Sequence, residues 1–247
     1  MEQWLIQAVI FDMDGLLTES ESRWRIAERE ACAELGLPYT DDDFDTTMGV
    51  RMRQITQLWF ADHPWEGPSP DHVADQIAGE KVVGFMQGRM EFGPRALGHR
   101  SILADPTRSN MKDLLNKYVK FREELRPFAP SVLAEHANEY FENCTDSPFM
   151  LFVYPVRPEK QHEVPAITHI DGTARVQTVT EAANPRYHAL IKAFADITGT
   201  PMLLNTSFNV MGEPIVHKPA DAIRCFYSTG MDVLAMGDYL IVKAPTS

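Results

Sequence analysis

The chain has 247 residues, of which 44% are hydrophobic, so it can bury a core as one large domain or two small ones. Its formal net charge of −12 disfavours nucleic acid as a partner, and no apolar run is long enough to cross a membrane. Three widely spaced cysteines without a CxxC pair, and a start without a leader pattern, argue against disulfides and structural zinc and favour a cytoplasmic location.

The first third of the sequence predicts one strand followed only by helices. An apolar run at residues 8–11 is typical of a buried strand, and it ends in the polar turn Asp12-Met13-Asp14-Gly15. Apolar residues at helical spacing then predict helices over residues 21–35, 51–61 and 71–77. The Pro/Gly-rich stretch HPWEGPSPD lies before the last of these helices and reads as a linker.

From residue 81 onward, short strands alternate with helices. The pattern predicts strands near residues 82–87, 101–104, 129–133, 149–155, 174–179, 201–205, 232–236 and 239–243. It predicts helices near residues 109–120, 135–141, 185–198 and 219–229. We therefore expect an α/β fold with a mixed twisted sheet in a second domain, residues 81–247. We expect residues 1–80 to form an N-terminal segment of one strand and a small helical cap.

A basic stretch between Gly88 and Ser131 interrupts this acidic chain. Residues 1–80 contain 17 acidic and 5 basic side chains, whereas residues 81–126 contain 10 basic and 5 acidic ones. Glycines, prolines and phenylalanines separate the basic residues Arg89, Arg95, Arg100, Lys117, Lys120, Arg122 and Arg126. Guanidinium groups can bind phosphate through two parallel hydrogen bonds, so we expect a site for a small anion here. The alternative is a solvated basic face.

The turn at Asp12 and Asp14 resembles the first motif of the haloacid-dehalogenase-like (HAD) phosphatases, and FDMDGLLTESE is close to their sugar-phosphatase branch. The resemblance covers residues 5–78, including the helical cap. It implies that Asp12 attacks phosphorus, that Asp14 transfers a proton, and that both lie beside Mg²⁺. The later motifs of these phosphatases are missing, with Thr206 and Asp238 as the nearest substitutes. A remnant strand-end turn is therefore the alternative interpretation.

Four long motifs follow one another over residues 81–243. They are GRMEFGPRALGHRSILADP, NKYVKFREELRPFAPSVL, THIDGTARVQTV and TGTPMLLNTSFNVMGEPIV. In this order they resemble the C-terminal domain of the nodulation-protein and antibiotic-type O-carbamoyltransferases. The resemblance implies a YrdC-like fold. It also implies that ATP and carbamoyl phosphate bind, with Mg²⁺ as cofactor, and form carbamoyl-adenylate for O-carbamoylation.

The same resemblance implies roles for individual residues. Catalytic and substrate-binding cations are Arg95, Lys120, Arg126 and Arg175. Such cations offset the repulsion between phosphates and stabilise charge that moves between them. Further substrate or nucleotide contacts are implied for Asn205, Ser207, His169 and Asp171. We expect His169 and Asp171 to orient Arg175 or its loop, and the alternative is a buried, hydrogen-bonded His–Asp pair.

The chain departs from this family at its N-terminal side. Full-length carbamoyltransferases of this kind carry a large N-terminal acceptor domain, and here the HAD-like segment stands in its place. We therefore expect a transferase that works with a separate acceptor-domain protein or has partial activity only. Two alternatives are a sugar-phosphate phosphatase acting through Asp12 and Asp14, and a non-catalytic anion-binding remnant.

Overall fold

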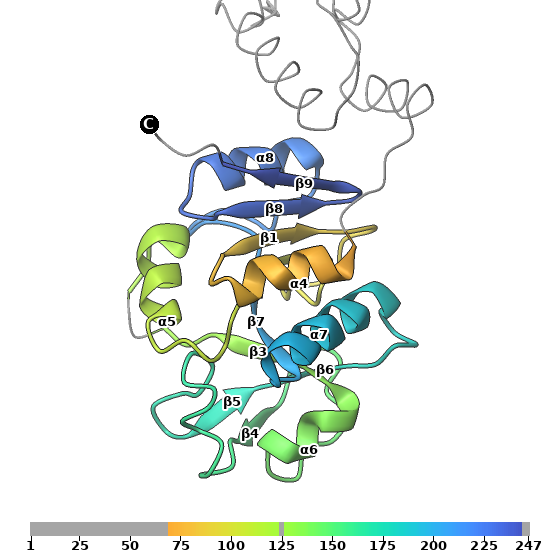
Figure 1. The fold of residues 1–247 in the computed structure, drawn as a ribbon. Helices are drawn as coiled ribbons and strands as arrows, with labels where there is room; N and C mark the ends of the chain where they lie inside the picture. Colours follow the sequence, from red (N-terminus) through yellow and green to blue (C-terminus); the bar gives the residue numbers. More distant parts are fainter. Residues whose placement is uncertain (1–68, 124–125, 244–247) are drawn as a thin grey trace, which may run out of the picture. The chain divides into compact units, whose positions relative to one another are not determined.

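The computed structural model describes residues 69–123 and 126–243. The strand and helices predicted within residues 8–61, together with Asp12 and Asp14, lie outside the described residues. The chain divides into two compact units, residues 1–66 and residues 67–247, and all described structure belongs to the second (Figure 1). None of the helices described within this second unit combines the length and apolarity needed to cross a membrane.

A seven-stranded sheet forms the centre of this unit. Its strands are β1 (Val83–Met86), β2 (Arg100–Ala104), β3 (Ala129–Leu133), β6 (Gln177–Val179), β7 (Met202–Ser207), β8 (Val233–Met236) and β9 (Tyr239–Val242). The strand order is β6-β3-β7-β2-β1-β8-β9. β3 runs parallel to β6 and β1 runs parallel to β8, whereas the other neighbours are antiparallel. The predicted mixed sheet is confirmed.

Helices cover both faces of the sheet because its strands are apolar on both sides. The helices are α4 (Pro70–Ala78), α5 (Met111–Leu114), α6 (Ala137–Tyr140), α7 (Pro185–Thr198) and α8 (Pro219–Tyr227). Figure 1 shows α4 and α7 together on one face, where they pack against Leu103 and Leu203. The adjacent residues on the same strands, Ile102 and Leu204, pack in the opposite layer, which contains α5 and α8. The described domain is therefore α/β.

The ends of α7 match the predicted helix at residues 185–198 and follow from the local sequence. Asn184 caps the first turn, because its Oδ1 accepts the main-chain N–H of Tyr187 at 3.1 Å. Pro185 occupies the first turn, where its missing N–H costs no hydrogen bond. Gly199 ends the helix in the left-handed region, with a φ of 76°.

Two predicted strands differ from the structure. The strand expected over residues 149–155 is only β4 (Val153–Pro155), and the one expected over residues 174–179 is interrupted at Val176. Its first half, β5 (Thr173–Arg175), pairs with β4 in a separate two-stranded sheet, and its second half is β6 of the main sheet.

Ser147 accounts for the change of sheet at Val176. This side chain is buried, and its Oγ donates to the Val176 carbonyl at 2.8 Å. The Ser147 main-chain N–H donates to Thr178 Oγ1 at 2.8 Å, and its carbonyl accepts the Thr178 N–H at 3.1 Å. The hydrogen-bonding groups of the chain are thus occupied by a loop at this point. The alternation of apolar residues, from which the strand was predicted, carries no information about a hydrogen-bond partner such as Ser147.

We expect Gly98→Ala to lower the free energy of unfolding by about 2–4 kcal/mol, because left-handed backbone strain and overpacking add together. Gly98 has a φ of 102°, and a Cβ there would lie 2.2 Å from Cδ1 of the buried Tyr187 ring. Urea denaturation measures the loss.

Gly88→Ala is the matched control, since Gly88 has a φ of 47° but no atom within 4 Å of the added Cβ. It should lose only about 1–2 kcal/mol from backbone strain. Equal losses in the two variants would show that the Tyr187 contact does not constrain the turn.

Candidate functional site

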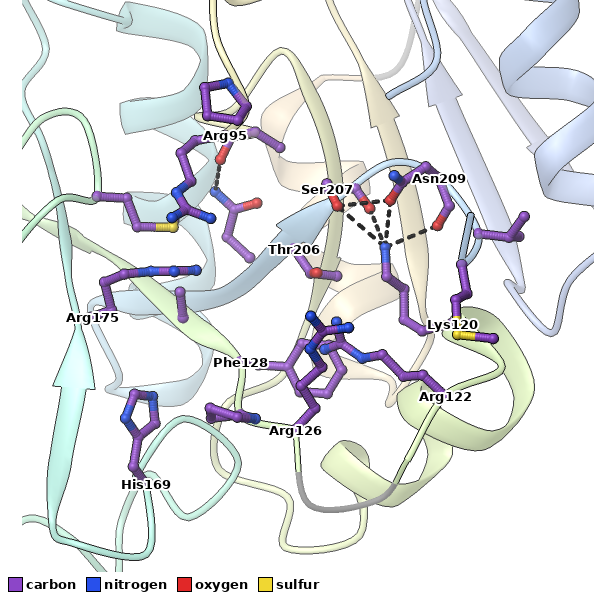
Figure 2. Close-up of a pocket in the computed structure, with 18 of the residues that line it drawn as sticks. Arg95, Lys120, Arg122, Arg126, Phe128, His169, Arg175, Thr206, Ser207 and Asn209 are labelled. Carbon is purple, nitrogen blue, oxygen red and sulfur yellow. Dashed lines mark hydrogen bonds between the residues drawn. The ribbon is translucent and has the colours of Figure 1, made fainter. Parts of the chain in front are cut away.

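A cavity of about 500 Å³ lies at the end of β7. Five cationic side chains from three segments of the chain line it, namely Arg95, Lys120, Arg122, Arg126 and Arg175. Figure 2 shows Arg95 and Arg175 on one side of Thr206, with Lys120 and Arg122 on the other. Among the described residues that line the cavity, none is Asp or Glu. The structure thus brings together the four cations selected from the sequence.

Arg95 stands on a turn that Glu91 organises. Oε1 of Glu91 accepts the main-chain N–H groups of Leu97, His99 and Arg100 at 2.6, 2.9 and 3.3 Å. One carboxylate therefore closes the GPRALG turn from within, and the neighbouring Arg95 side chain lines the cavity. Oε1 of Glu91 is thus occupied by main-chain donors, whereas Oε2 is buried without a hydrogen-bond partner.

A change of helix type positions the next two cations. The helix predicted over residues 109–120 begins as α5 but continues as the π-helix η1 (Leu115–Lys120). Phe121 follows with a left-handed φ of 50°. On a continuous α-helix, Lys120 and Arg122 would point about 200° apart. The left-handed residue between them redirects the chain, so both side chains line the same cavity. π-Helical turns are frequent at functional sites.

Lys120 joins the end of η1 to the end of β7. Its side chain is 3% exposed, and Nζ donates to the carbonyls of Ser207 and Asn209 at 2.8 and 2.9 Å and to Asn209 Oδ1 at 2.6 Å (Figure 2). Ser207 Oγ donates to the same Asn209 Oδ1 at 2.7 Å. Burial, followed by repulsion from Arg122, lowers the pKa of Lys120 to about 7. An arriving anion would restore the ammonium form.

Arg122 is held from two sides. Its guanidinium lies over the Phe128 ring, 4.8 Å from the centroid, and its Nε donates to Asn116 Oδ1 at 2.8 Å. Burial and repulsion from Arg126 lower the pKa of Arg122 to about 10. Sequence reasoning placed Arg122 in the basic stretch but gave it no site role. The position of Arg122 within the KFREELRPF motif, between Lys120 and Arg126, is the sequence signal that could have assigned it to the site.

Arg95 and Arg175 approach the cavity from the opposite side (Figure 2). Burial and then the charge of Arg95 lower the pKa of Arg175. The Nε atoms of both arginines are buried and have no hydrogen-bond partner. Two unused donors beside a cavity fit a ligand that supplies oxygen acceptors.

His169 lines the cavity, but Asp171 does not. Asp171 is exposed and borders a smaller neighbouring cavity with Lys112. Thr173 Oγ1 donates to Asp171 Oδ1 at 2.7 Å and lies 3.3 Å from His169 Nδ1. Hydrogen bonds from Thr173 lower the pKa of Asp171, and burial lowers the pKa of His169. The alternative of a buried His–Asp pair is therefore wrong, because the carboxylate is at the surface.

Other cations of the basic stretch lie away from the cavity lining. Arg100 is buried and donates to the carbonyls of Gln87, His99, Gly88 and His217 at 2.8–3.4 Å. It thereby ties two loops together. Arg89 and Lys117 are exposed. The expectation that the whole stretch holds anions is thus too broad.

No group of three or more His, Cys, Asp or Glu side chains within residues 69–123 and 126–243 could hold a metal ion. The structure adds Asn209 and Phe128 to the cavity lining. Asn209 follows Ser207 by two positions in the NTSFN motif, so the motif itself was the signal for it.

The matches to known proteins centre on the domain that carries this cavity. The family model described as carbamoyltransferase C-terminus matches residues 74–243. "Uncharacterized protein sll1178" of Synechocystis is 42% identical over 245 residues, covering 91% of this chain and 39% of the relative. Nodulation protein NolNO of Sinorhizobium fredii is 54% identical over 178 residues, covering 71% of this chain and 26% of the relative. The 3'-hydroxymethylcephem-O-carbamoyltransferase of Amycolatopsis lactamdurans is 40% identical over 168 residues, covering 68% of this chain and 32% of the relative.

These matches also show what portion of the relatives is present. The chain spans about a quarter to two fifths of the length of these three proteins. Residues 81–247 make up about two thirds of the chain, so the Synechocystis match, at 91% of the chain, extends into the N-terminal segment. The HAD resemblance of residues 5–78 stays a prediction.

One solved structure supports the fold. P. abyssi Sua5 complexed with L-threonine superimposes with a TM-score of 0.51 at 17% identity, covering 69% of this chain and 47% of Sua5. At that identity the likeness shows the fold alone. The described domain therefore has the predicted YrdC-like fold.

We expect anion binding in this cavity at pH 8 to be accompanied by proton uptake at Lys120. With a pKa of about 7, Lys120 is mostly neutral at that pH in the unliganded protein, and a bound anion raises its pKa. Calorimetry in two buffers of different ionisation enthalpy measures the uptake. Lys120→Met should abolish it.

Lys112→Met is the control, because Lys112 borders only the smaller cavity and should leave the uptake unchanged. Undiminished uptake in Lys120→Met would assign the proton to another group.

Proposed function

Because the chain belongs to the carbamoyltransferase family through its C-terminal domain, residues 74–243, we propose that this domain binds ATP and carbamoyl phosphate and forms carbamoyl-adenylate for O-carbamoylation. The observation that carries the proposal is the convergence of five cations on one cavity, with no carboxylate among its described lining residues. The cavity volume, about 500 Å³, falls within the range of roughly 300–1,000 Å³ that is usual for small-molecule sites.

The proposed reaction brings many negative oxygens together. Carbamoyl phosphate, ATP and one water give carbamoyl-adenylate, pyrophosphate and orthophosphate. Cations held on both sides of the β7 end lower the repulsion between the two substrates, and they stabilise charge that develops on the departing phosphate oxygens. Mg²⁺ would be held mainly by the nucleotide phosphates, because it commonly binds through substrate phosphates with only one or two protein carboxylates.

The acceptor step is the less complete half of the proposal. The name of the Amycolatopsis relative supports a hydroxyl group as the carbamoyl acceptor. As the source of the acceptor site we propose a separate acceptor-domain protein. Without it, we expect formation and slow hydrolysis of the adenylate only. A phosphatase acting through Asp12 and Asp14 is the competing function.

Replacing Arg126 or Arg175 with Ala should weaken binding of ATP or carbamoyl phosphate by about 1.5–3 kcal/mol, the range for a hydrogen bond to a charged group. The same variants should lose carbamoyl-phosphate-dependent exchange of pyrophosphate into ATP. Calorimetry measures the first effect and radiolabelled exchange the second.

Two controls separate the functions. Arg157→Ala removes an arginine outside the cavity lining, whose Nε donates to the Asn138 carbonyl, and should change neither measurement. Asp12→Asn should also leave binding and exchange unchanged. If Asp12→Asn instead weakened binding of ATP or carbamoyl phosphate while Arg126→Ala and Arg175→Ala left it unchanged, the phosphatase would be the better assignment.

A further inference from the structure

A series of buried side-chain amides determines the orientation of Asn205 on β7. The series begins at Gln177, which is 5% exposed and whose Nε2 donates to the Leu97 carbonyl at 3.0 Å. Its Oε1 must then face the other way, where it accepts the Ser131 hydroxyl at 2.6 Å. The main-chain carbonyl of Leu97 thus decides which side of Gln177 is nitrogen and which is oxygen.

The orientation passes from Ser131 to Asn205. Because the Ser131 hydrogen is used on Gln177, its Oγ is an acceptor toward Asn205 Nδ2 at 2.9 Å. The same Nδ2 donates to the Ala96 carbonyl at 3.0 Å and lies 3.2 Å from Gln177 Oε1. Three acceptors surround this position, so it must be the nitrogen. Flipping the amide would place its oxygen against all three.

The oxygen of Asn205 is left without a partner. The side chain is 1% exposed and lines the cavity, and its Oδ1 is buried with no hydrogen bond. A buried carbonyl oxygen in this state costs free energy unless a donor reaches it. Asn209, by contrast, also lines the cavity, but its Oδ1 accepts from Lys120 and Ser207.

Three residues that line the cavity each carry a buried side-chain atom without a hydrogen-bond partner, and together these atoms define a hydrogen-bond pattern. Asn205 Oδ1 requires a donor, whereas the buried Nε atoms of Arg95 and Arg175 require acceptors. A fully ionised phosphate supplies acceptors only, and a methyl group supplies neither. A carbamoyl group supplies both, because its NH₂ donates and its carbonyl oxygen accepts.

We propose that Asn205 Oδ1 is a specificity determinant that selects an acyl phosphate bearing an N–H on its acyl carbon. This rests on the proposed function, since it names the feature by which the site would distinguish carbamoyl phosphate from other acyl phosphates. Acetyl phosphate is the informative comparison, because it keeps the phosphate and the carbonyl and replaces NH₂ with CH₃.

The experiment compares calorimetric binding of carbamoyl phosphate and acetyl phosphate in a phosphate-free buffer. We expect the wild-type protein to prefer carbamoyl phosphate by about 10- to 100-fold, the effect of leaving one buried acceptor unpaired. Asn205→Leu keeps the branched shape but removes the acceptor, so the preference should fall to about threefold or less. Asn209→Leu is the matched control and should weaken both ligands while the preference stays as in the wild-type protein. Orthophosphate binding reports whether the anion cavity persists in each variant.

The outcomes separate this inference from its premise. Equal binding of the two acyl phosphates by the wild-type protein would overturn the role of Asn205 and leave the proposed function standing, and this test needs no variant to fold. An undiminished preference in Asn205→Leu would also overturn it. Binding of neither acyl phosphate nor ATP by the wild-type protein would overturn the proposed function and, with it, the role of Asn205.

Discussion

Five cationic side chains share one cavity, and their mutual repulsion is the constraint that the surrounding structure satisfies. Neutral oxygens position two of them: Lys120 contacts the carbonyls of Ser207 and Asn209, and Arg122 contacts Asn116. A carboxylate partner would hold each cation more strongly, but it would also cancel the charge that attracts a ligand. Neutral acceptors fix geometry and leave the field in place, which is what stabilisation of developing negative charge requires.

Irregular backbone is concentrated at the same place. η1 ends at the cavity, Phe121 is left-handed, and Met150, a cavity-lining residue that is 3% exposed, has a φ of 56°. Such conformations cost about 1–3 kcal/mol each and persist where the surrounding structure over-determines them. Regular helices and strands project neighbouring side chains in fixed directions, so they cannot aim Lys120 and Arg122 at one point. The irregularity is the means by which a regular α/β framework carries a dense cationic site.

The sequence predicted the framework better than the site. Strands and helices such as β1 and α7 were found because periodicity and caps are local signals, whereas the break at Val176 depends on Ser147, which is distant in sequence. Arg122 received no role, because the resemblance selected only Lys120 and Arg126 from the KFREELRPF motif. Arg100 and Arg95 are both arginines of one motif. Arg100 donates to four main-chain carbonyls and lies outside the cavity lining, whereas Arg95 lines the cavity. Residue type is local, but the identity of its partner is a property of the fold.

The distribution of carboxylates explains why net charge is a poor guide to this site. Residues 81–247 contain equal numbers of acidic and basic side chains, 18 of each, so the cavity is not cationic by composition. It is cationic because none of its described lining residues is Asp or Glu. Carboxylates elsewhere in the domain pair with basic side chains, as Glu163 does with Lys160 and Glu213 with Arg224, or accept main-chain N–H groups. Glu91 accepts three N–H groups of its turn, Asp221 accepts those of His217 and Lys218, and Asp232 accepts that of Val82. Because its carboxylates are occupied outside the cavity, a domain that is neutral overall can keep several guanidinium groups available to one anionic ligand.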